Sequence, residues 1–531
     1  MIGPANISLA RQLRRAHLPF RQLAVRADWP ALAAFSLPLL LYWLTAAPTI
    51  YNLDSAELTT AVATNGLMRA TGYPLYLLLG KLWSWLPLGA DIGQRMNLFS
   101  AFCGALTILL GERILRRMGA SAWARFAGLG LLASAHYFWA LSLIAEVYTL
   151  HTALMAGAIL ALMRWTEAPG PLRLALPVFL VALSMANHAA TVLLVPGCIW
   201  FVLAHHPQEM GKPRVLAAGA GALLLGASVY LLLPLRYATN PAFNYAGLYD
   251  AAGVFHPTNL HTWAGFWQLI SGQTFAGQMF GYRLAELGPQ LSAYAGQLWL
   301  AFFAIGIGPG LAGMAVLWRR DWRLSGALAL MFLANAIFYV NYRVVDKDTM
   351  FLPTYLIFAL WVGVGYQWLR GWVSASAQGT GEPPDPRFWR LRLDLLVPLV
   401  AVAAVILAVG SNWQRVDLSA DWTTREQSEA ILAQVEPNAL VFGWWDTVPA
   451  LQYLQLVEGR RPDVTVINRF LIRPEAMNQL ILTAVGKRPV YINNPSIALL
   501  RETAATAAGP LYRLEPHPSG SESPSSLPNG Q

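Results

Sequence analysis

The sequence predicts a polytopic α-helical membrane protein with a small extracytoplasmic α/β domain at its C-terminal end. Only 12% of the 531 residues are charged and 56% are hydrophobic, whereas soluble domains contain about 25% charged residues. Apolar stretches of helical length recur as far as residue 411, and charges return together with short β-branched runs from Trp413 onward. This composition excludes a soluble globular, a disordered or a fibrous protein.

The apolar stretches predict about eleven transmembrane helices, because about 20 apolar residues are needed to cross the hydrocarbon core of a bilayer. The candidate stretches are residues 30–47, 96–112, 126–144, 148–163, 172–187, 189–204, 215–234, 295–317, 324–341, 351–369 and 394–411. A further apolar stretch, 73–88, is interrupted by Pro74 and Pro87 and contains Lys81. We expect a re-entrant or interfacial helix there instead of a crossing.

The basic residues predict the topology. When the spans alternate, the loops on one side hold 20 of the 37 Lys and Arg residues and carry a net charge of +12, against −1 for the opposite loops and −2 for the C-terminal region. Basic loops stay in the cytoplasm, so we expect a cytoplasmic N-terminus, an uncleaved first span and a C-terminus outside. The overall charge of +9 is then a consequence of topology, and no nucleic-acid partner is expected.

The chain divides into four expected regions. They are a basic cytoplasmic N-terminus (1–29), a transmembrane domain (30–411) with outside loops at 48–95 and 235–294, an extracytoplasmic α/β domain (412–516) and a disordered tail (517–531). In the α/β region, apolar runs at 439–445, 463–468 and 489–494 are expected to form buried strands with helices between them. Such alternation predicts a mostly parallel sheet. A Gly-, Pro- and Ser-rich linker at 374–386 precedes the last span.

Polar residues gather at span ends on the outer side. Ionisable groups at or near membrane depth are candidate functional residues. Five separate regions supply them: Asp54 and Glu57; Glu146 and Tyr148; Asn187 and His188; Arg236; and Arg343, Asp346, Lys347 and Asp348. Their convergence on one side predicts a single site there.

Asp54 and Glu57 are three residues apart, which places both carboxylates on one face of a helix. Two close carboxylates push one pKa upward, and a carboxylate can serve as general base toward a hydroxyl. The alternative is structural, because the same Asp-x-x-Glu spacing caps helix N-termini. The spacing alone leaves both interpretations open.

The other polar candidates also have plain alternatives. Glu146 and His188 could contact headgroups at helix ends, and Arg236 and Arg343 could extend to the interface instead of binding a phosphate through the guanidinium fork. No metal site is predicted. Cys103 and Cys198 lie in apolar runs, and the histidines of the large outside loop have no carboxylate at ligand spacing. A divalent metal would be compatible with the chemistry but has no support in the sequence.

The first outside loop resembles a known family. The segment 51–101, with its Asp54-x-x-Glu57 and Gly72-Tyr73-Pro74-Leu-Tyr, is similar to the hallmark segment of the protein O-mannosyltransferase-like membrane family, which belongs to the GT-C glycosyltransferases. Further stretches resemble the family in the same order: AEVYTLH (145–151), ANH (186–188), LPLR (233–236), YRVVDKDTMFLPTY (342–355) and the soluble end at 439–468. The resemblance covers most of the chain. It departs at Arg69, where the family often has histidine.

The resemblance implies a GT-C-like fold and a glycosyltransferase that uses a polyprenyl-phosphate sugar. The expected reaction transfers a mannose-like sugar to a hydroxyl acceptor, either a protein Ser/Thr or a glycan, on the extracytoplasmic side of a bacterial inner membrane. Asp54 occupies the position of the family's catalytic acid, with Glu57 beside it. Arg236, Arg343, Lys347 and Arg69 are the candidate ligands of the donor phosphate. The further substrate-site candidates are Glu146, Tyr148, His188, Tyr73 and Asp346. The partners expected are the bilayer, the lipid-linked donor and the acceptor, with no separate cofactor.

Two other functions remain open at this point. A transporter or lipid flippase would also need many spans, although such proteins show paired repeats and ionisable groups near the midplane. A catalytically inactive relative could use the outside domain to bind a partner. Donor hydrolysis or sugar transfer would distinguish an enzyme from both.

Overall fold

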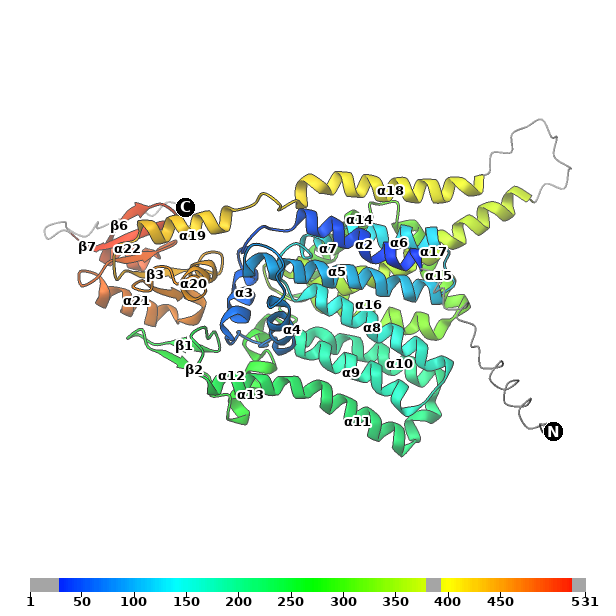
Figure 1. The fold of residues 1–531 in the computed structure, drawn as a ribbon, viewed down its shortest axis with the longest axis horizontal. Coiled ribbons are helices and arrows are strands. Elements are labelled where there is room, and N and C mark those ends of the chain that lie inside the picture. Colours follow the sequence, from blue (N-terminus) through cyan, green and yellow to red (C-terminus); the bar gives the residue numbers. More distant parts are fainter. Residues whose placement is uncertain (1–27, 379–392, 518–531) are drawn as a thin grey trace, which may run out of the picture.

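The computed structural model describes residues 28–378 and 393–517. An elongated bundle of helices carries a sheet-containing segment at one end, and helices α3 (Asp54–Thr64) and α4 (Pro74–Ser84) lie between the two (Figure 1). The predicted basic N-terminus, the linker and the C-terminal tail fall mainly outside the described residues.

The bundle is built from apolar helices that are broken at several points. Its helices are α2 (Trp29–Thr45), α5 (Ile92–Arg117), α6 (Ala122–Ser134), α7 (His136–Ala140), α8 (Tyr148–Glu167), α9 (Pro171–Asn187), α10 (Val195–His205), α11 (Pro213–Ala227), α12 (Leu232–Ala238), α14 (Leu284–Ala301), α15 (Ile307–Arg320), α16 (Trp322–Val340), α17 (Leu352–Gln378) and α18 (Leu393–Val416). Among the described residues, five helical stretches are long and apolar enough to cross a membrane. They are Ile92–Arg117, Pro213–Ala238, Trp322–Val340, Lys347–Ser374 and Leu395–Val416. The figure of eleven crossings therefore stays a prediction.

Two predicted spans are not continuous helices. The stretch 126–144 is divided between α6, which ends at Ser134, and α7, which covers His136–Ala140 after the extended residue Ala135. The apolar stretch 295–317 is not a single helix, because α14 ends at Ala301 and α15 begins at Ile307. Phe303 and Ala304 between them have positive φ angles of 51° and 57°, a left-handed conformation that cannot continue an α-helix. Hydropathy carries no sign of this break, since the residues on both sides and within it are apolar. The stretch 73–88 forms the 11-residue helix α4, which is too short to cross a bilayer.

The first outside loop is pinned to the bundle before it reaches α3. The buried Asn97 of α5 donates its side-chain N–H groups to the carbonyls of Ala47 and Thr49 at 2.9 and 2.8 Å. Gly93 permits the close approach, since a Cβ there would lie 2.4 Å from the backbone nitrogen of Ile50. The chain that leaves α2 is thereby held against the start of α5, and this fixes where α3 begins.

The C-terminal segment is a five-stranded mixed sheet with helices. Its elements are α19 (Thr423–Gln434), β3 (Leu440–Gly443), α20 (Val448–Leu456), β4 (Thr465–Asn468), α21 (Pro474–Ala484), β5 (Val490–Ile492), α22 (Ile497–Glu502), β6 (Thr503–Ala508) and β7 (Leu511–Pro516). The strand order is β4-β3-β5-β7-β6, in which β3 is parallel to β4 and β5. Strand β7 pairs antiparallel with β5 and β6. Strands β6 and β7 were not predicted from the sequence. The small second sheet, β1 (Gly247–Tyr249) with β2 (Phe255–Pro257), belongs to the large outside loop.

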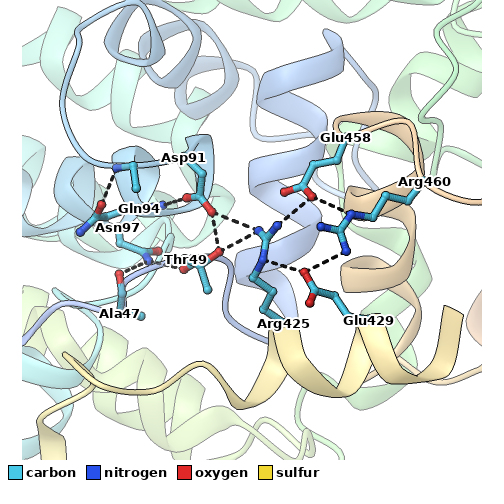
Figure 2. A network of polar contacts seen from close by, with 10 residues as sticks. Ala47, Thr49, Asp91, Gln94, Asn97, Arg425, Glu429, Glu458 and Arg460 are labelled. Carbon is cyan, nitrogen blue, oxygen red and sulfur yellow. Dashed lines mark hydrogen bonds and ion pairs between the residues drawn. The ribbon is translucent and has the colours of Figure 1, made fainter. Parts of the chain in front are cut away.

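Figure 2 shows how the C-terminal segment is fastened to the first outside loop. Arg425 of α19 donates to Thr49 and to Asp91 at 3.3 and 3.4 Å, and to Glu429 and Glu458 at 3.0 and 2.8 Å. Asp91 also accepts from the Thr49 hydroxyl and, as N-cap of α5, from the backbone N–H of Gln94. Apolar contact accompanies this network, since Ile50 and Ala56 of the first loop lie in one core with residues of α19 and α20.

Arg425→Met should loosen this attachment, because it removes the cation that joins three carboxylates across the junction. We expect a loss of about 1–3 kcal/mol in docking free energy, the range for hydrogen bonds to charged groups. Hydrogen-exchange mass spectrometry of the full chain in detergent should then show roughly tenfold faster exchange in α3 and α20. Arg460→Met is the matched control, because Arg460 binds the same Glu429 and Glu458 without reaching the first loop. Equal exchange in both variants would contradict the assignment.

Candidate functional site

Asp54 and Glu57 are not capping residues, so the structural alternative for this pair is wrong. Helix α3 begins at Asp54 itself, its N-cap is Leu53 with φ 56°, and no side chain caps it. Both carboxylates instead accept hydrogen bonds from Arg69. One guanidinium nitrogen, Nη2, lies 2.9 Å from each Asp54 oxygen, and Nη1 lies 2.6 Å from Glu57 Oε2.

The three side chains differ in their access to water. The Glu57 side chain is 0% exposed, whereas Asp54 and Arg69 are 23% and 22% exposed. The Arg69 guanidinium carbon also lies 4.1 Å from the centre of the Trp445 ring. The group therefore combines α3, the turn before α4 and the loop after β3, and the carboxylate that is accessible to solvent is Asp54.

Burial changes the protonation of the Glu57 carboxyl group. It raises the pKa of Glu57 to about 8, because removal from water disfavours the charged form. The Arg69 charge lowers this pKa, and the Asp54 charge raises it further. Glu57 is thus mainly protonated at neutral pH. Two carboxyl groups in contrasting environments are the usual arrangement where one acts as base and the other as a hydrogen-bonding partner.

Glu146 approaches the same group from the junction before α8. It is 8% exposed, and its Oε2 has no hydrogen-bond partner among the described residues. Burial, followed by the charges of Asp54 and Asp346, raises the pKa of Glu146 well above its usual value. The structure thus brings Glu146 and Asp54 into one electrostatic group, with Asp346 at its exposed edge.

Aromatic and imidazole rings line one flank of this group. Ring centres of Tyr73 and Tyr148 lie 6.4 and 5.5 Å from that of His188, and the His151 ring lies 5.4 Å beyond. Buried nitrogens of His188 (Nδ1) and His151 (Nε2) have no partner within the described part of the chain. Tyr73 has φ 43° and Gly72 has φ 79°, so a left-handed turn directs the chain into α4 at this point. Unpartnered buried polar atoms of this kind can bind the hydroxyls of a ligand.

Of the four candidate phosphate ligands, Arg343 and Lys347 lie together, whereas Arg236 and Arg69 each bind other parts of the protein. Arg343 and Lys347 share one aromatic ring, with the Arg343 Cζ and the Lys347 Nζ 5.4 and 4.5 Å from the centre of Tyr282. Lys347 also donates to the Tyr282 hydroxyl at 3.3 Å and to Gln290, which are neutral partners. Arg236 is buried and donates to the carbonyl of Gly66 at 3.0 Å, so it holds the backbone segment that follows α3. Arg69 is engaged by the two carboxylates.

Some members of the site were not predicted. Trp445, Tyr282 and His151 all contact the predicted residues. A signal existed for Trp445, because it is the last residue of the predicted strand at 439–445, and residues at the carboxyl ends of parallel strands commonly carry function. Within the described residues, no three His, Cys, Asp or Glu side chains are arranged to hold a metal ion.

The sequence of this chain is similar to those of known proteins. Residues 54–211 match the family described as "Protein O-mannosyl-transferase TMEM260 N-terminal domain". The protein O-mannosyl-transferase tmem260 of Dictyostelium discoideum is 20% identical over 468 residues, 81% of this chain and 56% of that protein. The protein O-mannosyl-transferase TMEM260 of Mus musculus is 31% identical over 191 residues, 35% of this chain and 26% of that protein. The chain thus spans about half the length of the first relative and about a quarter of the second.

A solved structure identifies the fold. ArnT from Cupriavidus metallidurans, bound to undecaprenyl phosphate, aligns with 92% of this chain and 98% of its own at 12% identity, with a TM-score of 0.59. The chain therefore shares its overall fold with ArnT. The predicted resemblance to the protein O-mannosyltransferase-like family is confirmed by the family match and the two relatives.

Glu57→Gln should make stability less dependent on pH between about 5 and 8. The folded-state pKa of about 8 lies above the ordinary value of 4.5. The folded protein therefore keeps a proton that the unfolded chain releases, and stability falls as pH rises through this window. The slope from this group is at most about 1.4 kcal/mol per pH unit, and glutamine abolishes it. Thermal unfolding in detergent across this range measures the slope, with Glu475→Gln at an exposed site as control. An unchanged slope in Glu57→Gln would contradict the raised pKa.

Proposed function

We propose that this protein is an integral-membrane glycosyltransferase that moves a mannose-like sugar from a polyprenyl-phosphate donor to a hydroxyl of a protein or glycan. The observation that carries the proposal is the pair of carboxyl groups of α3 joined by Arg69. The printed names of the two relatives support the enzyme class. The undecaprenyl phosphate bound to ArnT supports a lipid-phosphate donor.

Asp54 is the proposed general base. Its side chain is partly exposed, so an acceptor hydroxyl can reach it, and a carboxylate in hydrogen-bond contact can take the proton during attack. The acceptor oxygen forms a bond to the anomeric carbon, while the bond from that carbon to the phosphate oxygen breaks. The proton passes to Asp54, the polyprenyl phosphate leaves, and the anomeric configuration inverts. Glu57, buried on the far side of Arg69, keeps the guanidinium in place.

Lys347 and Arg343 are the proposed ligands of the donor phosphate, whose negative charge grows as the sugar leaves. Their partners given above are an aromatic ring and neutral oxygens, so their charge is available to an anion. The buried polar groups Glu146 and His188, with Tyr73 and Tyr148, would contact the hydroxyls of the sugar. Asp346 would mark the exposed edge of the site.

We propose the membrane orientation from the distribution of charge. Arginines lie at the ends of α5 and α15, at Arg116, Arg117, Arg319 and Arg320, whereas the candidate site lies by the opposite end of α5. Because basic residues are retained in the cytoplasm, the site and the C-terminal segment would lie outside, in the periplasm of a bacterial inner membrane, after about eleven crossings.

Asp54→Asn should reduce sugar transfer by about 10²–10⁴-fold, the usual contribution of a positioned general base. The amide keeps the size of the side chain and loses its ability to take a proton. The assay uses the reconstituted full chain with a panel of polyprenyl-phosphate sugars and follows transfer to hydroxyl acceptors. Asp446→Asn is the control, because Asp446 is exposed beside Trp445 and outside the carboxylate group. Transfer by Asp54→Asn at the wild-type rate would contradict the role of base.

Lys347→Met should raise the KM for the lipid-phosphate donor by about tenfold and leave the acceptor KM unchanged. The reason is the loss of one charge-assisted bond to the phosphate, while methionine keeps the apolar stem against Tyr282. Steady-state kinetics with donor and acceptor varied in turn separates the two constants. Lys487→Met, at an exposed position of the C-terminal segment, is the matched control. An unchanged donor KM would exclude Lys347 from the phosphate site.

A further inference from the structure

Trp445 brings the C-terminal segment into the candidate site. The residue lies in the loop after β3, and the Arg69 Cζ lies over its indole ring, 4.1 Å from the ring centre. Tyr245 and Phe470 pack edge-on against the same indole, with ring centres 5.7 and 4.9 Å away. The indole is therefore supported by two other rings while it also contacts Arg69.

Two kinds of partner hold the Arg69 guanidinium: carboxyl groups at its nitrogens and an indole ring near its central carbon. Nη1 and Nη2 donate along one edge to Glu57 and Asp54. Bonds along an edge still allow a guanidinium to tilt about that edge, and an aromatic ring stacked on the face removes this freedom. The Trp445 ring, with the Arg69 Cζ 4.1 Å from its centre, is the aromatic ring close enough to restrict this tilt.

The C-terminal segment is anchored on both sides of this contact. Arg425 joins it to the first outside loop (Figure 2). On the other side, the Tyr245 hydroxyl donates to Gln452 Oε1 at 2.5 Å, and the Asn468 amide donates to the Tyr245 oxygen at 3.4 Å. These bonds place the loop after β3 at a fixed distance from α3, so that the ring can act on Arg69.

We propose that Trp445 is a positioning residue of the active site: its ring holds Arg69 in the plane in which that residue binds Asp54 and Glu57. The C-terminal segment then completes the carboxylate site instead of serving only to recognise an acceptor. The catalytic consequence of this inference rests on the proposed glycosyltransferase function, whereas the effect on the carboxylates does not.

The neighbouring Trp444 provides a matched control within the same loop. It packs edge-on against Phe470, with ring centres 5.0 Å apart, and its own ring carries Arg469 at 4.2 Å. Trp444→Ala therefore removes an equal indole from the same aromatic cluster without removing the ring under Arg69. Trp445→Phe is the conservative variant, because it keeps an aromatic face and loses only the indole N–H.

The first experiment needs no enzyme activity. The full chain in detergent is treated with a water-soluble carbodiimide and an amine, and labelling of Asp54 is followed by peptide mass spectrometry. We expect about tenfold faster labelling in Trp445→Ala, and rates within twofold of wild type in Trp445→Phe and Trp444→Ala. In an Arg69→Gln background, adding Trp445→Ala should change the rate little, because the two residues act as one unit. Wild-type labelling in Trp445→Ala, or an equal increase in the Arg69→Gln background, would overturn the proposal.

The second experiment measures catalysis by the same variants. Trp445→Ala should lower kcat for sugar transfer by about tenfold, and Trp445→Phe should retain the wild-type kcat. The double variant Trp445→Ala/Arg69→Gln should have the same kcat as Arg69→Gln alone. If Trp445→Phe fails as completely as Trp445→Ala, the indole N–H is the essential group and the role of the aromatic ring is wrong. If the wild type transfers no sugar from any lipid-phosphate donor, the proposed function fails, and the labelling experiment still decides the role of Trp445.

Discussion

The pairing of Arg69 with Asp54 and Glu57 is the interaction on which the end of the bundle beside the C-terminal segment depends. A carboxyl group without exposure to water, such as Glu57, is costly to bury unless a cation and hydrogen bonds accompany it. Several local features serve this pairing. Leu53 and Tyr73 have positive φ angles on either side of it, and Arg236 supports the intervening turn through the carbonyl of Gly66. The local backbone conformation thus places the Arg69 guanidinium beside both carboxyl groups.

The residues of this pairing also link the helix bundle to the C-terminal segment. Helix α3 contributes its polar start to the carboxylate site, and Ala56 of the same helix lies in the core of the C-terminal segment. The face of Arg69 rests on Trp445, and Arg425 ties the first loop to α19. A displacement of the C-terminal segment would therefore change both the packing of α3 and the environment of its carboxylates.

Sequence patterns predicted those features that depend on nearby residues. Apolar runs located α5, α16 and α17, and the β-branched runs at 439–445, 463–468 and 489–494 coincide with β3, β4 and β5. The span at 295–317 failed because the left-handed turn at Phe303 and Ala304 occurs among apolar residues that give no local sign of it. The capping alternative for Asp54 and Glu57 could not be settled from spacing, since the decision lay in the backbone of Leu53 and in a partner twelve residues beyond Glu57. Trp445 is far from Arg69 in sequence, and only the folded chain brings the two together.

The identity of residue 69 has a further physical consequence. The resembled family often has histidine here, whose imidazole offers two donors pointing in different directions and whose charge is lost near neutral pH. Arginine is a permanent cation with a flat fork. It can bind both oxygens of Asp54, reach Glu57 with its second nitrogen and still present a whole face to an indole. A histidine could not satisfy all three partners at once. The close dependence between the carboxylate site and Trp445 therefore follows from arginine at this position, and it would weaken in a relative that carries histidine.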